Sequence, residues 1–227
     1  MSSATVLEMN STAVSFLAQG KHEVSHCTLQ KALEGFRNVL NESDDSPAMN
    51  VHDDAEMDST TLYTVAIHDA QHKSLEERSM VTVYNRAFVL QSEEKPSFTE
   101  NEHTVPAVLL YNMGLSHHMQ AMQSGNSTVL RKALQLYTMS FTLLEQASDM
   151  LNDMDIMVLL ALSNNMGVIT GSQFYDRAGA ETSRQMMERV LGSADCLEVL
   201  EDEDIEFFSL NLMFLTEHQQ HALAAAA

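Results

Sequence analysis

The chain has 227 residues, 44% of them hydrophobic, which is enough to bury a substantial core as one domain or two small ones. Its 32 acidic and 12 basic side chains give a formal charge of −20, and such a field repels phosphate backbones and anionic lipid surfaces. The charge therefore disfavours nucleic-acid and membrane binding and makes a basic protein the natural partner, with solubility alone as the competing explanation.

Cysteine content and the N-terminal residues bear on the compartment. Cys27 and Cys196 are the only cysteines, too few for a disulfide framework, so a reduced pair is expected. Residues 1–10 lack a basic stretch followed by an apolar one, and no apolar run approaches the roughly 18–20 residues of a membrane helix. The sequence predicts an intracellular protein, in the cytoplasm or the nucleus.

The N-terminal residues 1–41 predict a first helical hairpin. Residues 5–19 and 22–40 place apolar side chains three or four positions apart, which is typical of helices with one buried face. Gly20 ends the first of these helices. A short loop between two such helices folds them into an antiparallel pair.

The helical pattern is interrupted between residues 42 and 103. An acidic stretch at 41–59 has little periodicity and is interpreted as a loop. Segments 62–67 and 80–84 are short and rich in β-branched and aromatic residues, so they predict a two-stranded ribbon that rests on the helices. A second polar loop is expected at 91–103.

Helical periodicity returns at Thr104, which is a suitable N-cap, and continues through residues 104–227. The next helix is capped by Ser127 or Thr128, and Asp153 or Asp155 opens another. The helix that Asp153 or Asp155 opens is expected at 156–169, and further segments with helical spacing are 175–191 and 207–223. The predicted fold is mainly α: about seven helices, stacked as antiparallel hairpins with a short two-stranded β-ribbon insert, in a single domain spanning 1–227.

The tripeptide Asn-Met-Gly occurs twice, at Asn112–Gly114 and Asn165–Gly167, each time near the front of a helical stretch. A glycine inside a helix costs about 1 kcal/mol relative to alanine, so two placed alike indicate a close approach between helices. Small and aromatic residues also recur at one spacing in two other segments: Ala32, Phe36 and Val39, and Ala133, Tyr137 and Ser140.

These residues resemble the tetratricopeptide repeat, which has a small residue early in the first helix and an Ala-x-x-x-aromatic pattern in the second; the likeness covers about two thirds of the chain. The chain departs from the family period of about 34 residues, since 167 − 114 = 53 residues separate the two motif glycines, and the closing proline is missing. The resemblance implies a concave face, lined by the first helices of the hairpins, that receives a protein or peptide.

The candidates for lining that groove are polar or adaptable residues on first helices: Asn112, His118, Met119, Met122, Asn164 and Asn165. A groove of this family that clamps a terminal carboxylate uses Lys, Arg and Asn. Residues 104–125 contain no Lys or Arg, which argues against an acidic C-terminal peptide as ligand. Hydrogen bonds between helices are the alternative explanation for the asparagines, because buried amides are normally paired.

Motifs for catalysis, cofactors and metals are missing from the sequence. Histidine pairs at helical spacing, such as His22 and His26, need further ligands that no adjacent motif supplies. Asn152–Asp155 lacks the Gly and Glu of a calcium loop, and Gly167–Gly171 is not a nucleotide-binding loop. We expect a non-enzymatic protein without metal or cofactor.

The sequence thus predicts a protein–protein interaction adaptor, a monomer or weak homo-oligomer, that binds a protein or peptide in a helical groove. The acidic stretches 44–58 and 198–206 are either solvated loops or docking strips for basic segments. One alternative is an all-α enzyme whose site the sequence does not reveal. The other is a structural protein that self-assembles through the apolar C-terminal helix, namely Phe207, Phe208, Leu212, Met213 and Phe214.

Overall fold

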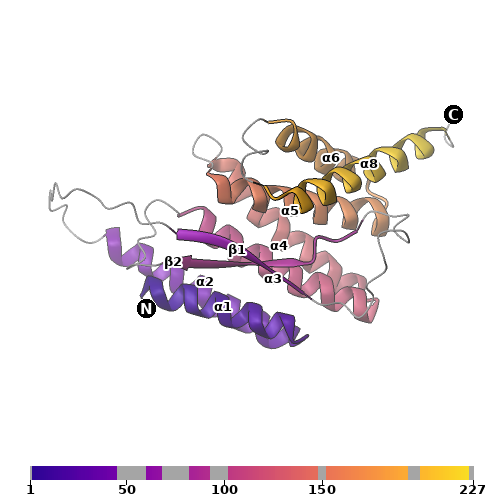
Figure 1. Ribbon diagram of the computed structural model, residues 1–227. Helices are drawn as coiled ribbons and strands as arrows, with labels where there is room; N and C mark the ends of the chain where they lie inside the picture. Colours follow the sequence, from indigo (N-terminus) through magenta and orange to yellow (C-terminus); the bar gives the residue numbers. More distant parts are fainter. Residues whose placement is uncertain are drawn as a thin grey trace. The chain divides into compact units, whose positions relative to one another are not determined.

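The computed structural model describes residues 2–44, 60–67, 82–92, 102–147, 152–193 and 200–224. The described part is mainly α, with seven helices packed in consecutive pairs and a two-stranded antiparallel ribbon between α2 and α3 (Figure 1). The predicted fold class is therefore confirmed. The chain divides into two compact units: Met1–Ile67 with Arg86–Leu143, and His68–Asn85 with Leu144–Ala227. The predicted single domain stays a prediction.

Unit 1 contains α1 (Ser3–Ala18), α2 (His22–Asp44), α3 (Thr104–Ser124) and most of α4 (Ser127–Gln146). Three buried serine hydroxyls join neighbouring helices, each by donating to a backbone carbonyl. Ser25 donates to Ala13 O at 2.8 Å, Ser116 to His22 O at 2.9 Å, and Ser140 to Ala107 O at 2.7 Å. A hydroxyl is small enough to let two helix backbones approach, so these contacts fix α1 on α2, α2 on α3 and α3 on α4.

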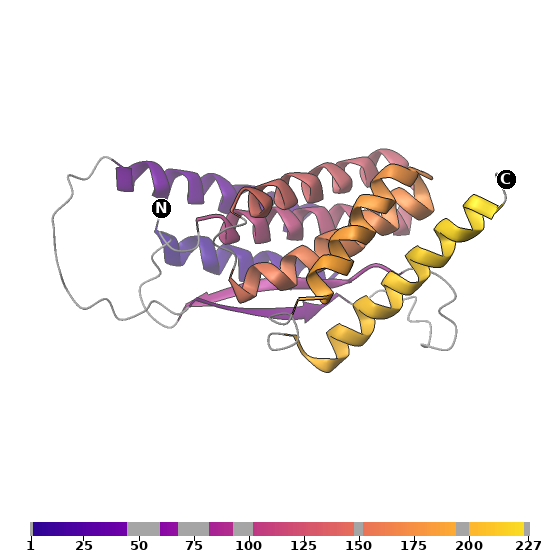
Figure 2. The same ribbon diagram turned by 90° about the horizontal axis from the view of Figure 1, so that it is seen from above.

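The ribbon of unit 1 pairs β1 (Thr60–Ala66) with β2 (Arg86–Ser92), and the two strands lie side by side in Figure 2. Partners run from Thr60 opposite Ser92 to Ala66 opposite Arg86. The first strand was predicted almost correctly, but the second was wrong: it lies at 86–92 and not at 80–84. Residues Ala87 to Leu90 are buried against α1 and α3, so the apolar run 87–90 forms the paired strand.

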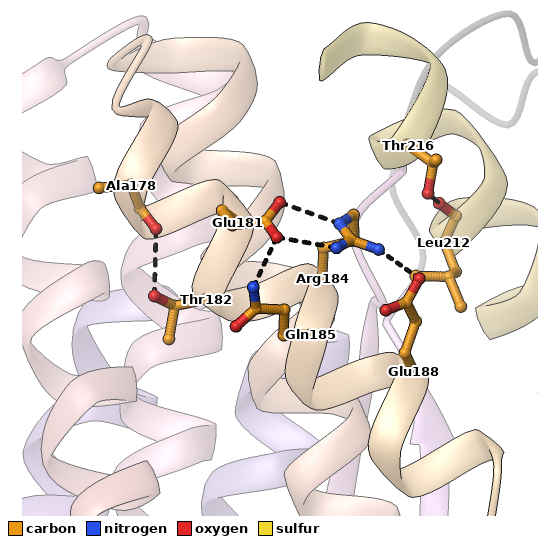
Figure 3. Close-up of polar contacts among 8 residues, drawn as sticks. All are labelled: Ala178, Glu181, Thr182, Arg184, Gln185, Glu188, Leu212 and Thr216. Carbon is orange, nitrogen blue, oxygen red and sulfur yellow. Dashed lines mark hydrogen bonds and ion pairs between the residues drawn. The ribbon is translucent and has the colours of Figure 1, made fainter. Parts of the chain in front are cut away.

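Unit 2 contains α5 (Asp153–Val168), a π-helical turn (Ile169–Gln173), α6 (Arg177–Leu191) and α8 (Asp202–Ala224). A capping box opens α5: Asn152 Oδ1 accepts from Asp155 N, and Asp155 Oδ2 accepts from Asn152 N. On α6, Arg184 pairs with Glu181 and Glu188 at helical spacing (Figure 3). This outer face of α6 is polar, and its other side packs on α5 and α8.

Several element boundaries differ from the sequence predictions. The N-cap of α4 is Asn126, whose Oδ1 accepts from Thr128 N at 2.9 Å, and not Ser127 or Thr128. Helix α2 continues to Asp44. Helix α8 starts at Asp202 and has three acidic residues in its first turn, where they are favourable. The predicted loops at 41–59 and 91–103 otherwise lie mostly outside the described residues.

One stretch, Asp153–Gln173, is long and apolar enough to cross a membrane, and 72% of its most apolar window is buried inside the protein. A core helix has the same length and composition. The stretch is therefore weak evidence in either direction about a membrane.

Candidate functional site

The glycine of each Asn-Met-Gly motif lies where another side chain crosses its helix. A Cβ added to Gly114 would lie 2.7 Å from the ring of the fully buried Tyr137 on α4. A Cβ on Gly167 would lie 3.2 Å from Leu215 on α8 and from Ser183 on α6. Gly114 therefore leaves no room for a Cβ and Gly167 leaves little, which is the packing role that the sequence spacing predicts.

The asparagine of the first motif holds a backbone residue of β2. Asn112 Oδ1 accepts from Phe88 N at 2.9 Å, and Asn112 Nδ2 donates to Phe88 O at 2.7 Å. Both groups of one residue point to the same side of an extended chain, where a neighbouring strand would normally bind them. The side-chain amide of Asn112 therefore replaces a strand on this edge of β2.

Two further residues complete this arrangement, which we call the unit 1 clamp (Asn10, Tyr111 and Asn112). Asn10 on α1 donates to Phe88 O at 3.1 Å and accepts from Asn112 Nδ2 at 2.9 Å. Tyr111 donates its hydroxyl to Arg86 O at 3.1 Å, and its ring lies 4.8 Å from that of Phe88. The clamp thus binds two alternate backbone positions and the aromatic side chain of Phe88.

The asparagine of the second motif does the same in unit 2. Tyr84 N donates to Asn165 Oδ1 at 2.7 Å, and Asn165 Nδ2 donates to Tyr84 O at 3.1 Å. Asn165 is fully buried and Tyr84 is 2% exposed, so both bonds are shielded from water. Buried hydrogen bonds of this kind are costly to leave unmade.

Two other asparagines hydrogen-bond the backbone of Thr82, and with Asn165 they form the unit 2 clamp (Asn164, Asn165 and Asn211). Asn211 on α8 accepts from Thr82 N at 3.1 Å and donates to Thr82 O at 2.8 Å. Asn164 also donates to Thr82 O, at 2.9 Å, and accepts from Asn211 at 2.6 Å. Segment 82–84 is therefore bound through its main chain at every second residue.

The side chain of Tyr84 contacts four residues of unit 2 that we call the tyrosine socket (Met157, Asp204, Phe207 and Phe208). Its ring lies 4.9 Å from Phe208 and 5.4 Å from Phe207, the latter nearly edge-on. Its hydroxyl donates to Asp204 Oδ1 at 3.1 Å and lies 3.8 Å from Met157 Sδ. The socket therefore matches both the flat ring and the polar tip of a tyrosine.

The two clamps share one rule of spacing. The motif asparagine binds both backbone groups of an aromatic residue, Phe88 or Tyr84, and the residue before the asparagine donates to the carbonyl two positions earlier. The helical positions differ by 165 − 112 = 53 residues, and the bound aromatic residues by 88 − 84 = 4. The repeat therefore includes the hydrogen bonds that each motif helix makes to an extended segment, and not the helix sequence alone.

The predicted groove residues fall into three groups. Asn112, Asn164 and Asn165 are buried and hydrogen-bonded to the chain's own extended segments. His118 and Met119 are 1% and 2% exposed, and His118 Nδ1 lies 3.4 Å from the Tyr137 hydroxyl, so both belong to the core of unit 1 in this conformation. Met122 is 48% exposed on α3. Contact of these six residues with a partner stays a prediction.

Histidines gather between α2 and α3. The rings of His26 and His117 lie 4.4 Å apart. Burial lowers the pKa of both, and the positive Lys132 lowers both further. Burial also lowers the pKa of His118, to about 3, so this imidazole is neutral at physiological pH. Among the described residues, no group of three or more His, Cys, Asp or Glu is arranged to hold a metal ion.

Sequence reasoning missed half of the clamp residues. The missed residues are Asn10 on α1, Tyr111 on α3 and Asn211 on α8, and Tyr84 and Phe88 were assigned no role as bound residues. A usable signal was present: Asn10 and Asn211 lie on helix faces whose other buried residues are mostly apolar. A buried amide needs partners, and neutral side-chain amides offer one donor group and one acceptor, which is what a main-chain residue requires.

No known protein-family model, curated protein or solved structure matches this chain.

Proposed function

We propose that the protein is a non-enzymatic adaptor that binds extended polypeptide segments through asparagine clamps, on helical hairpins of a divergent tetratricopeptide-like kind. The observation that carries the proposal is that both Asn-Met-Gly motifs bind the N–H and C=O of one extended residue. Such hydrogen bonds are made to the main chain of the ligand, so they can form with any extended segment. Side chains that flank the clamp add a preference for particular ligand residues.

Charge supports a basic or neutral ligand. The chain carries a net charge of −20, and Asp202, Glu203 and Asp204 open α8 next to the tyrosine socket. Acidic ligands would be repelled, while a cationic segment would gain in association rate at low salt. Binding in this proposal therefore weakens as ionic strength rises.

A displayed library of short random peptides tests the proposal directly. Selection on the full chain should enrich neutral or basic peptides of extended character, and Asn165→Ala or Asn211→Ala should reduce their capture at least tenfold. Asn126→Ala, which changes an exposed helix cap, is the matched control and should leave capture unchanged. Circular dichroism checks that each variant is folded. Enrichment of no peptide, or capture that is independent of both clamp asparagines, contradicts the proposal.

The alternative function, self-assembly, would use the same helix, α8, as the tyrosine socket. Phe207 and Phe208 pack on Tyr84 of their own chain, while Met213 remains 47% exposed on α8. Light scattering over a range of concentrations separates the two functions, because an adaptor of this kind stays monomeric when no peptide is added.

A further inference from the structure

The further inference concerns segment 82–84, which the unit 2 clamp and the tyrosine socket enclose; it rests on the proposed function. We propose that this segment is a resident ligand: it occupies a site for extended tyrosine-containing peptides and must leave before such a peptide binds. The site therefore selects a Thr-x-Tyr or similar segment of neutral or basic charge, and the chain blocks it in the resting state.

The contacts of Thr82 show why a peptide would bind in one register. Its N–H donates to Asn211 and its carbonyl accepts from Asn164 and Asn211. The hydroxyl of Thr82 lies 3.3 Å from Asn211 Oδ1. Two residues later Tyr84 meets Asn165 in the same manner. A ligand shifted by one residue would turn its backbone groups to the wrong side and lose all of these bonds.

The socket adds the side-chain preference. The rings of Phe207 and Phe208 accept any aromatic residue. Asp204, which is 4% exposed, accepts a hydrogen bond from the tyrosine hydroxyl through Oδ1. A phenylalanine would leave that carboxyl oxygen without this donor. Sites built to hydrogen-bond a hydroxyl discriminate against analogues that lack it. Tyrosine is therefore preferred over phenylalanine.

Tethering explains how the chain would regulate the site. A segment of the same chain competes with an outside peptide at an effective concentration on the order of millimolar. Peptides with a weak intrinsic affinity for the empty site are then excluded, and removal of the resident segment raises their apparent affinity. The resident contacts thus set the threshold for binding.

The test uses a fluorescent peptide with blocked ends and the sequence Val-Thr-Val-Tyr-Asn-Arg, added to the full chain. In the double variant Thr82→Pro/Tyr84→Ala, the resident segment loses its first N–H donor and its ring. Fluorescence anisotropy should show at least tenfold tighter binding to this variant than to the unaltered chain. Tyr175→Ala is the matched control, since Tyr175 is an 85% exposed tyrosine of the same unit, and it should change nothing.

Two altered peptides test the chemistry. Replacing the peptide tyrosine with phenylalanine should weaken binding to the double variant about tenfold. Methylation of the tyrosine backbone nitrogen should abolish binding, because the peptide then has no N–H to donate to Asn165 Oδ1. Equal binding of all three peptides, or no gain on emptying the site, overturns the inference. If library peptides still bind in an asparagine-dependent way, the proposed function survives that failure.

Amide hydrogen exchange on the unaltered chain covers the case in which the double variant does not fold. The N–H groups of Thr82 and Tyr84 should exchange slowly, and millimolar Val-Thr-Val-Tyr-Asn-Arg should speed their exchange by displacing the segment. The N-methylated peptide should have no such effect. Unchanged exchange rates at saturating peptide overturn the inference.

Discussion

The two units use one motif for two kinds of bound segment. In unit 1, Asn112 holds a residue of β2, and the opposite edge of that strand is paired with β1 along its length. In unit 2, Asn165 holds Tyr84 in a segment that pairs with no strand among the described residues. The main chain of Thr82 and Tyr84 is bound by asparagine side chains of α5 and α8. The comparison teaches that the same amide contact is part of a sheet in one unit and of a ligand-like site in the other.

The largest expected effect tests whether the clamp supports unit 1. Asn112→Ala removes both bonds to Phe88 and the one to Asn10, in a fully buried position. The free energy of unfolding should fall by about 3 kcal/mol, because the buried N–H and C=O of Phe88 and the Oδ1 of Asn10 each lose a hydrogen bond to Asn112. Chemical denaturation measures the loss. Asn38→Ala, an exposed asparagine within α2, is the control and should be neutral. A loss below about 1 kcal/mol would show that water replaces the amide.

The motif glycines sharpen the comparison, because their surroundings differ in tightness. Gly114→Ala forces a Cβ to within 2.7 Å of the buried ring of Tyr137, and overpacking of this kind costs about 2 kcal/mol. Gly167→Ala meets Leu215 and Ser183 at 3.2 Å, where the end of a leucine moves more easily. The helix propensity gain of about 1 kcal/mol then offsets most of the cost. Denaturation of both variants should place Gly114→Ala well below Gly167→Ala, and the reverse order would contradict the packing argument.

These elements show what the sequence could predict and what it could not. Helix positions, the first strand of the ribbon and the packing role of Gly114 and Gly167 follow from local spacing, since helical periodicity, a β-branched run and a costly glycine are visible in a short window. The bound partners do not: Asn10 meets Asn112 across 102 positions, and Thr82 meets Asn211 across 129. The strand error has the same origin. Residues 82–84 are extended and have strand-like composition, but asparagines from α5 and α8 satisfy their backbone groups in place of a strand.

A buried histidine distinguishes unit 1 by its response to acid. The position equivalent to His118 in the second motif is Gly171, since 118 + 53 = 171. Burial lowers the pKa of His118 from 6.5 to about 3, so the folded state stays unprotonated while the unfolded state takes up a proton below pH 6.5. Stability is therefore full above pH 6.5 and is lost as pH falls toward 3. The part due to His118 should amount to about 2 kcal/mol at pH 5.

Denaturation curves of the His118→Gln variant and the unaltered chain at several pH values isolate this contribution. The variant should lose less stability between pH 7 and pH 5 than the unaltered chain does. Asn126→Ala, which changes an exposed helix cap and removes no titratable group, should keep the original pH dependence. Equal slopes for His118→Gln and the unaltered chain would mean that His118 takes up its proton in the folded state at an ordinary pH.

The smallest effect compares the tyrosine hydroxyls of the two units. Tyr111→Phe removes a bond to a backbone carbonyl, that of Arg86, and should cost about 0.5–1 kcal/mol. Tyr84→Phe removes a bond to the carboxyl group of Asp204 and should cost about 1–1.5 kcal/mol, because this bond is buried whereas that of Tyr111 is only partly buried. Each variant keeps its ring contacts, so denaturation reports on the hydroxyl alone. If Tyr84→Phe cost less than Tyr111→Phe, Asp204 would not be selecting a tyrosine, and the socket of unit 2 would be an aromatic pocket no more specific than the contact between Phe88 and Tyr111.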